Sequence, residues 1–155
     1  MQLSTRRVEI CGVTPNPDAP WVQQMARNLL DYEDGFFLNT KYLLLDRDSK
    51  FCPFRGVLEC SYTEVVLLPP RSPNLNAYVE RFMRTLKSEC LDNLIFFGEQ
   101  PLRVALKEFS EHYHSERNHQ GISNDLIEPK TEIGHDQGAI QCKERLGGML
   151  RYYYR

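Results

Sequence analysis

The first part of the chain alternates between polar and apolar side chains. Residues 6–13 have the period of a strand, with Val8 and Ile10 on one face. A proline-containing turn follows over residues 14–17, and Asp18 then has the position of a helix N-cap. The apolar side chains of the predicted helix are Trp21, Val22, Met25 and Leu29. This pattern predicts a strand, a turn and an amphipathic helix that ends near residue 31.

Two short apolar segments predict further strands. Residues 42–45 are continuously apolar and end at Asp46, which is typical of a strand covered on both faces. Residues 63–68 are rich in β-forming side chains, and a short helix is expected around residues 53–60. Three prolines in residues 69–74 exclude regular structure and predict a rigid loop.

Two longer helices are predicted in the second half of the chain. Residues 77–90 carry an apolar stripe of Tyr78, Val79, Phe82, Met83, Leu86 and Cys90. A second helix begins near Pro101 and ends within residues 115–118. Its apolar side chains are Leu102, Ala105, Leu106, Phe109 and Tyr113. From residue 121 onward we expect loops and short turns, and we divide the chain into a core of residues 1–125 and a C-terminal extension of residues 126–155.

Composition is that of a globular protein of 155 residues, with 41% hydrophobic and 26% charged residues. No apolar run is long enough for a membrane span or a signal peptide, so we expect a cytoplasmic protein without a membrane partner. The five cysteines are odd in number and include no C-x-x-C motif. We therefore expect reduced, mainly buried thiols instead of disulfides or a zinc ribbon.

The net charge and the local distribution of charge lead to different expectations about nucleic-acid binding. The net charge of −2 argues against a protein that binds nucleic acid. Between residues 71 and 87, however, one acidic residue, Glu80, stands among basic ones. These basic residues are Arg71, Arg81, Arg84 and Lys87. They predict either a solvated helix face or a surface that binds DNA.

Two carboxylates have positions suited to binding a ligand or a metal ion. Asp46 follows a predicted buried strand, and ligands gather at the carboxyl ends of strands in open α/β sheets. Glu80 lies in the first turn of a predicted helix. Taken singly, Asp46 reads as a turn or capping residue and Glu80 as a complement to the helix dipole. Together they could hold Mg²⁺, with Arg84 and Lys87 facing a phosphate backbone, as phosphoryl transfer on a polynucleotide requires.

Residues 45–51 and 68–82 together resemble the integrase core of DDE transposases, in the insertion-sequence branch related to retroviral integrases. The spacing of Asp46 and Glu80 is close to that of the family's second Asp and its Glu, and Lys87 matches the basic residue seven positions later. Residues 111–121 resemble the family's helix-ending tyrosine and Arg-x-His-Gln stretch.

The resemblance implies an α/β, RNase H-like fold, in which helices flank a mixed sheet. It also implies a role in DNA transposition and DNA integration by strand transfer that depends on Mg²⁺ or Mn²⁺. Asp46 and Glu80 would be the catalytic and metal-binding residues. The residues expected at DNA are Lys87, Arg84, Arg71, Arg81 and His119.

The chain departs from the family at the first Asp, whose nearest counterpart is the neutral Gln2. The first central strand is also missing. We therefore expect little or no activity from the chain alone, as in a truncated gene or one with a misassigned start codon. The alternative is a non-catalytic remnant that binds DNA without a metal or forms oligomers with itself or with an intact transposase.

Three other sites are disfavoured by residue spacing. His112, His114 and His119 are not at helical i, i+4 spacing, which argues against zinc. Cys90 has no neighbouring histidine to activate it as a nucleophile. Trp21 and the tyrosines at 152–154 could stack on bases, but we expect them to pack within the protein or, at the terminus, to fray.

Overall fold

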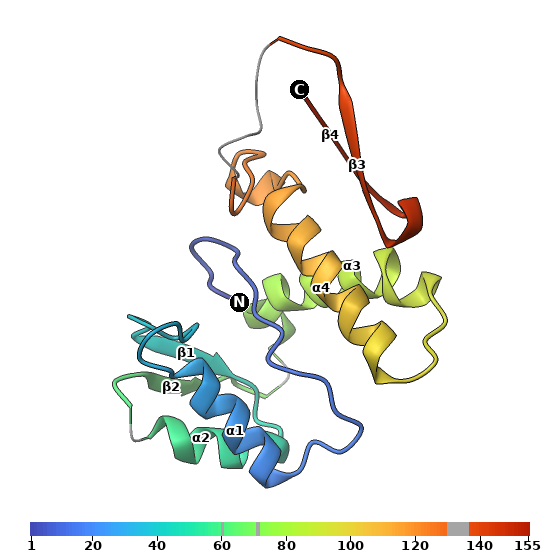
Figure 1. Ribbon diagram of the computed structural model, residues 1–155. Coiled ribbons are helices and arrows are strands. Elements are labelled where there is room, and N and C mark those ends of the chain that lie inside the picture. Colours follow the sequence, from blue (N-terminus) through green and yellow to red (C-terminus); the bar gives the residue numbers. More distant parts are fainter. Residues whose placement is uncertain (60, 71, 130–136) are drawn as a thin grey trace. The chain divides into compact units, whose positions relative to one another are not determined.

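The computed structural model describes residues 1–59, 61–70, 72–129 and 137–155. It contains two compact units (Figure 1). Residues Glu9–Ala77 form the β1–β2 unit, and Met1–Val8 with Tyr78–Arg155 form the α3–α4 unit. Each unit has its own helices, strands and buried side chains.

The β1–β2 unit contains two helices and two parallel strands. Helix α1 spans Ala19–Leu29, and the Asp18 side chain accepts a hydrogen bond of 2.9 Å from the backbone N–H of Trp21, which confirms the predicted N-cap. Strands β1 (Tyr42–Leu45) and β2 (Glu64–Leu67) pair in parallel. Helix α2 (Cys52–Leu58) lies between them in the chain and follows the 3₁₀ turn η1 (Ser49–Phe51). These elements match the predicted ones.

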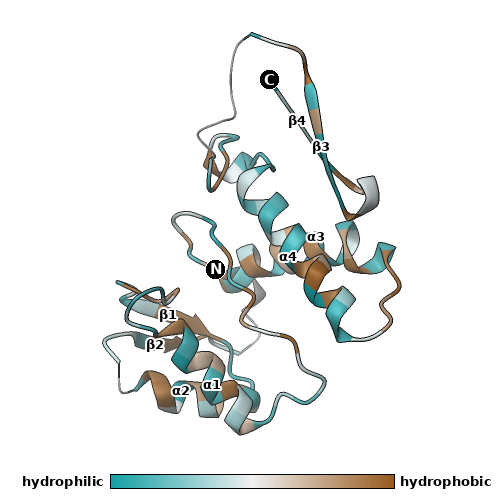
Figure 2. Cartoon of the chain, in the orientation of Figure 1, coloured by the Kyte–Doolittle hydropathy of each residue, from teal (hydrophilic) through white to brown (hydrophobic). Residues whose placement is uncertain are grey.

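One face of the β1–β2 sheet is covered and the other is exposed. Leu43, Leu45 and Val65 pack against a core built from Val22, Ala26, Leu29, Phe36, Phe54 and Leu58. Both strands are mostly apolar (Figure 2), yet Tyr42 and Leu44 are 54% and 42% exposed. The expectation that residues 42–45 are covered on both faces is therefore wrong. Helices α1 and α2 cover one face only, and parallel strands require a layer on each side to be fully buried.

The strand expected over residues 6–13 is absent, because these residues are irregular in the structure. A strand needs a neighbour to accept its backbone hydrogen bonds. The backbone N–H of Val8 instead donates to Nε2 of His114 at 3.1 Å. Alternation alone does not supply a partner strand.

The proline-rich loop contains one short regular turn. The 3₁₀ turn η2 spans Pro73–Asn76, although we expected no regular structure in residues 69–74. A proline is compatible with the first position of a helical turn, where its missing N–H would have no partner in any case.

The α3–α4 unit is built on two helices joined by η3 (Leu91–Asn93). Helix α3 spans Ala77–Glu89 and helix α4 spans Glu99–Ser115, as predicted. Phe82 of α3 packs against Phe109 and Tyr113 of α4, with ring centroids 6.1 and 5.0 Å away. The prediction that Tyr78 and Met83 belong to the packed apolar stripe of α3 is wrong, because these side chains are 48% and 53% exposed. The stripe is wider than the surface that α4 covers.

The segment after residue 126 contains a hairpin, so the expected loops and short turns are a wrong prediction. Strands β3 (Gln141–Arg145) and β4 (Leu150–Tyr154) pair in antiparallel fashion around η5 (Leu146–Gly148). Gly147 and Gly148 have positive φ angles of 66° and 90°, which glycine tolerates best. The hairpin is too rich in charge for hydrophobic alternation to reveal it. The boundary at residue 125 stays a prediction.

The described cysteines are free thiols, but most are not buried. Cys11, Cys52 and Cys142 are exposed and only Cys90 is buried, so the expectation of mainly buried thiols is wrong for the described residues. Cys60 lies outside these residues. Among the described helices, none is long and apolar enough to cross a membrane.

The chain is a mixed α/β protein, as expected, with small sheets accompanied by helices. The described strands form two separate pairs, β1–β2 and β3–β4. The single mixed sheet of an RNase H-like fold stays a prediction.

Candidate functional site

Asp46 lies where the sequence predicted it, directly after strand β1. Its Oδ1 accepts a hydrogen bond of 2.7 Å from the backbone N–H of Arg47. The Arg47 side chain donates through Nε to the backbone oxygen of Leu68 at 2.8 Å, which ties the carboxyl ends of β1 and β2 together. The hydrogen bond to the Arg47 N–H orients the Asp46 carboxylate. Because Asp46 is also exposed, this carboxylate is open to a ligand.

The neighbouring Asp48 has a structural role. Its Oδ1 accepts a hydrogen bond of 3.0 Å from the backbone N–H of Lys50 and caps η1. Its second oxygen lies 3.6 Å from the Lys50 ammonium. Of the two carboxylates after β1, Asp46 therefore has the less engaged side chain.

Glu80 lies in the first turn of α3 and is exposed. It forms no hydrogen bond or ion pair within the described part of the chain. Arg81, Arg84 and Lys87 are also exposed on α3, as a DNA-binding role requires. Asp46 belongs to the β1–β2 unit and Glu80 to the α3–α4 unit, so their convergence on one metal ion stays a prediction. Arg71 lies outside the described residues.

A pocket of about 360 Å³ opens on the α3–α4 unit. It is lined by Met1, Arg6, Tyr78, Arg81, Thr85, Tyr113, Arg117, Asn118, His119, Gln120 and Gly121. The Arg6 guanidinium lies 3.6 Å from the centre of the Tyr78 ring, a cation–π contact. The pocket thus brings two predicted DNA-binding residues, Arg81 and His119, to one place.

His119 is held by the end of α4. Its Nε2 lies 2.7 Å from the backbone oxygen of Tyr113, to which it donates, and its ring packs edge-on to the Tyr113 ring at 4.6 Å. Burial lowers the pKa of His119, although the Tyr113 carbonyl acts in the opposite direction. His119 is therefore neutral at pH 7 and would meet DNA as a hydrogen-bonding group, without positive charge.

Three residues of this pocket, Arg117, Tyr78 and Arg6, were not predicted from the sequence to bind a ligand. Arg117 stands in the Arg-x-His-Gln stretch, where the motif offered a signal. Tyr78 was placed in the apolar stripe, and its exposure depends on what α4 leaves uncovered. Arg6 lies far from α3 in the chain, and no local pattern could have placed it against Tyr78.

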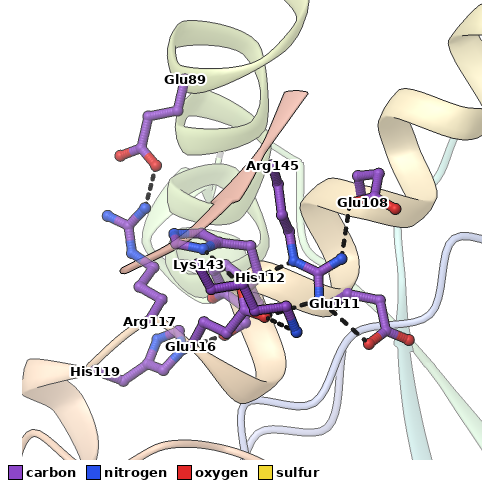
Figure 3. A network of polar contacts seen from close by, with 10 residues as sticks. Glu89, Glu108, Glu111, His112, Glu116, Arg117, His119, Lys143 and Arg145 are labelled. Atoms are coloured by element: carbon purple, nitrogen blue, oxygen red, sulfur yellow. Dashed lines mark hydrogen bonds and ion pairs between the residues drawn. The ribbon is translucent and has the colours of Figure 1, made fainter. Parts of the chain in front are cut away.

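A network of charged side chains joins the hairpin to α4 (Figure 3). Glu116, just after α4, has a side chain only 1% exposed. Its carboxylate accepts two hydrogen bonds from Arg145, of 2.7 and 2.8 Å, and pairs with Lys143 at 2.8 Å. Arg145 also reaches Glu108 at 2.7 Å. This network anchors the hairpin, since each pair joins β3 to α4 or to Glu116 directly after it.

The protonation state of this network follows from its contacts. Burial by itself raises the pKa of Glu116, but hydrogen bonds from Arg145, Lys143 and His112 outweigh burial and lower the pKa to about 2. Burial lowers the pKa of His112, although the hydrogen bond to Glu116 and the charge of Glu116 act to raise it. At pH 7 the Glu116 carboxylate is therefore charged and His112 is neutral.

The described histidines, His112, His114 and His119, are not grouped as metal ligands. His112 Nδ1 lies 3.2 Å from Glu116, and His114 Nε2 accepts from the N–H of Val8. Within residues 1–59, 61–70, 72–129 and 137–155, no three His, Cys, Asp or Glu side chains are grouped to hold a metal ion. Cys90 is buried, and burial raises the pKa of its thiol.

Residues 62–125 match the family model described as integrase core domain. These residues belong to the integrase core domain of the DDE transposase and integrase superfamily. The integrase segment covers less than half of the chain and contains Glu80, Arg81, Arg84, Lys87 and His119, whereas Asp46 lies before it. Neither a curated protein nor a solved structure matches the chain. The match confirms the predicted resemblance over residues 62–125, and an integrase core domain suggests a transposase- or integrase-like function.

Proposed function

We propose that the chain acts in DNA transposition and DNA integration, with an integrase core that cuts or joins DNA strands at phosphodiesters. The observation that carries this proposal is the integrase core match over residues 62–125, which includes Glu80 and the basic residues that follow it. Glu80 lies on an exposed turn of α3, where it is open to a ligand.

Asp46 and Glu80 fit a divalent cation by their chemistry. Integrase core domains of this superfamily normally use such a metal. Both carboxylates are exposed, and Glu80 has no competing cation within the described residues. Mg²⁺ prefers carboxylate oxygens together with substrate phosphates, and Mn²⁺ accepts the same ligands. When bound, the metal would activate the attacking oxygen and stabilise the leaving one.

The basic residues of α3 would hold the DNA backbone beside Glu80. Arg84 and Lys87 follow Glu80 by one and two turns, which places them about 6 and 10 Å along the helix axis. Both side chains are exposed and therefore free to meet phosphates. Each such contact would contribute affinity independent of sequence that falls as salt rises.

Catalysis by residues 1–155 alone is expected to be weak. Gln2 stands at the position that corresponds to the family's first Asp, and its side-chain oxygen accepts a hydrogen bond of 2.9 Å from the Thr5 hydroxyl. A neutral amide does not replace a bridging carboxylate between two metal ions. We therefore propose that the chain binds metal and DNA but transfers strands poorly unless a further carboxylate is supplied.

Paramagnetic broadening by Mn²⁺ tests the metal site without relying on activity. In ¹H–¹⁵N spectra of the full chain, the amides around Asp46 and around Glu80 should broaden at the same low Mn²⁺ concentration. Asp46→Asn should remove the broadening near Glu80, and Glu80→Gln should remove it near Asp46. The matched controls are Asp48→Asn, which alters only a capping residue, and Glu99→Gln, a first-turn glutamate of α4 paired with Arg103. Broadening near one carboxylate only would refute a shared site.

The alternative is a non-catalytic module that binds DNA or forms oligomers with itself or with an intact transposase. The arginine-lined pocket favours it, since the pocket needs no metal to attract phosphate. The module would bind DNA equally well with Mg²⁺ and with a chelator, and Asp46→Asn and Glu80→Gln would leave this binding unchanged. Nicking of DNA that requires Mg²⁺ or Mn²⁺ and disappears in both variants would exclude the alternative.

A further inference from the structure

The pocket on the α3–α4 unit combines positive charge with aromatic surface. Arg81 and Thr85 line it from α3, one turn apart, and Arg117 lines it from beyond the end of α4. Arg6 adds a third guanidinium from the first residues of the chain. Among the described lining residues there is no carboxylate, although Glu89, outside the lining, pairs with Arg117.

The three arginines differ in how many contacts their guanidinium groups already make within the protein. Arg117 pairs with Glu89, and Arg6 donates to the backbone oxygen of Leu3 at 2.6 Å while its guanidinium lies over Tyr78. Arg81 is exposed and forms no hydrogen bond or ion pair within the described part of the chain. Arg81 therefore offers an unused planar fork of donors, which suits a phosphate group.

The remaining lining suits a nucleotide better than a simple anion. Thr85 and Tyr78 supply hydroxyl groups, and the half-exposed Tyr78 ring, with Arg6 over it, supplies apolar surface against which a base could stack. A volume of about 360 Å³ lies at the lower end of the range for small-ligand sites, so it has room for about one nucleotide and excludes a duplex.

We propose that this pocket binds one phosphodiester group of a DNA strand, with Arg81 as its main ligand and an adjoining nucleoside against the exposed Tyr78 ring. This inference rests on the proposed function, because it takes the DNA strand as the source of the phosphate. Free inorganic phosphate shares the same chemistry and is the second source to be tested.

The dinucleotide TpT is a suitable probe, because it contains a single phosphodiester. Its methylphosphonate analogue has nearly the same shape and no charge. Titration of the full chain, followed by the ¹H–¹⁵N signals of Thr85 and Gly121, should show TpT binding about tenfold or more tightly than the analogue, as expected for a charged hydrogen bond. Arg81→Ala should abolish this preference. Lys107→Ala removes one charge from an exposed position on α4 outside the pocket and should preserve it.

Three results would overturn the inference while leaving DNA binding by the chain intact. They are no shift at Thr85 and Gly121, an equal loss of TpT preference in Arg81→Ala and Lys107→Ala, and inorganic phosphate that binds as tightly as TpT. Failure of longer single-stranded and duplex DNA to bind the chain at all would overturn the inference together with the proposed function. The spectra of Arg81→Ala report directly whether this variant is folded.

Discussion

Replacing Glu116 by glutamine removes one charge from the buried network while keeping the shape of the side chain. The carboxylate lies just beyond the C-terminus of α4, where the helix dipole disfavours negative charge. It is stabilised there by Arg145 and Lys143 from strand β3. Glu116→Gln leaves both cations without their main partner, and we expect the hairpin and α4 to lose much of their mutual stabilisation.

The magnitude follows from the pKa of Glu116. In the folded chain it lies at about 2, against an ordinary value of 4.5. Each unit of pKa corresponds to about 1.4 kcal/mol, so the charged carboxylate contributes about 3 kcal/mol to the free energy of unfolding. Because the folded pKa is the lower one, this contribution is complete above pH ~4.5 and is lost as the pH falls through about 2. At pH 3, about half should remain.

Urea unfolding of the wild-type chain and of Glu116→Gln at several pH values measures this contribution. The wild type should be more stable by about 3 kcal/mol at pH 7, and the difference should shrink steadily between pH ~5 and pH ~2. Glu144→Gln is the matched control, because Glu144 pairs with Arg151 at 3.0 Å on the exposed part of the same hairpin. An exposed pair contributes only about 0–1 kcal/mol, and its removal should have a small effect.

A difference below about 1 kcal/mol at pH 7 would refute this account of Glu116. So would a difference that stays constant down to pH 2, because the lost stability would then come from packing and not from charge. Glu144→Gln destabilising the chain as much as Glu116→Gln would show that burial of the network does not matter.

Three further substitutions test the packing of each unit. A Cβ at Gly35 would lie 2.3 Å from the backbone oxygen of Asp31, so Gly35→Ala should destabilise the β1–β2 unit by about 1–3 kcal/mol in urea unfolding. Leu58 is fully buried, and Leu58→Ala should cost about 2–5 kcal/mol by the same measurement. Burial lowers the pKa of His114, whose ring accepts the Val8 N–H, so hydrogen-exchange protection of Val8 should be complete at pH ~6.5 and above and be lost only as the pH falls through the lowered pKa of His114. His114→Ala should lack this protection at every pH, and protection that survives would refute the contact.

Local order was predictable because it depends on neighbours in the chain. The N-cap at Asp18 and the helical spacing that follows it require no distant partner, and α1 begins where the sequence predicts. The same holds for α3 and α4, whose apolar periods fix their limits. The position of Asp46 at the end of β1 follows from the bounded apolar run before it.

The candidate site was predictable only in part. Its residue types follow from the motif around Glu80, which the integrase core match includes. The pocket beside Arg81 could not be predicted, since it depends on Arg6 crossing to Tyr78 from another part of the chain. Sequence spacing places side chains on a helix face but does not state which distant residues will lie against them.

The sequence by itself determined helices α1 to α4, the positions of strands β1 and β2, and the resemblance to an integrase core, because these depend on short-range periods, caps and a contiguous motif. Only the tertiary structure decided which apolar faces are covered and which charges meet. Residues 6–13 alternate as a strand would but pair with no strand among the described residues, whereas the charged segment 141–145 pairs with 150–154 and joins Glu116 through Arg145. The reason is physical: a hydrogen-bond ladder or an ion pair needs two partners, and the pattern of one segment does not state whether its partner is the next segment, as for β3 and β4, or a distant residue, as for Arg145 and Glu116.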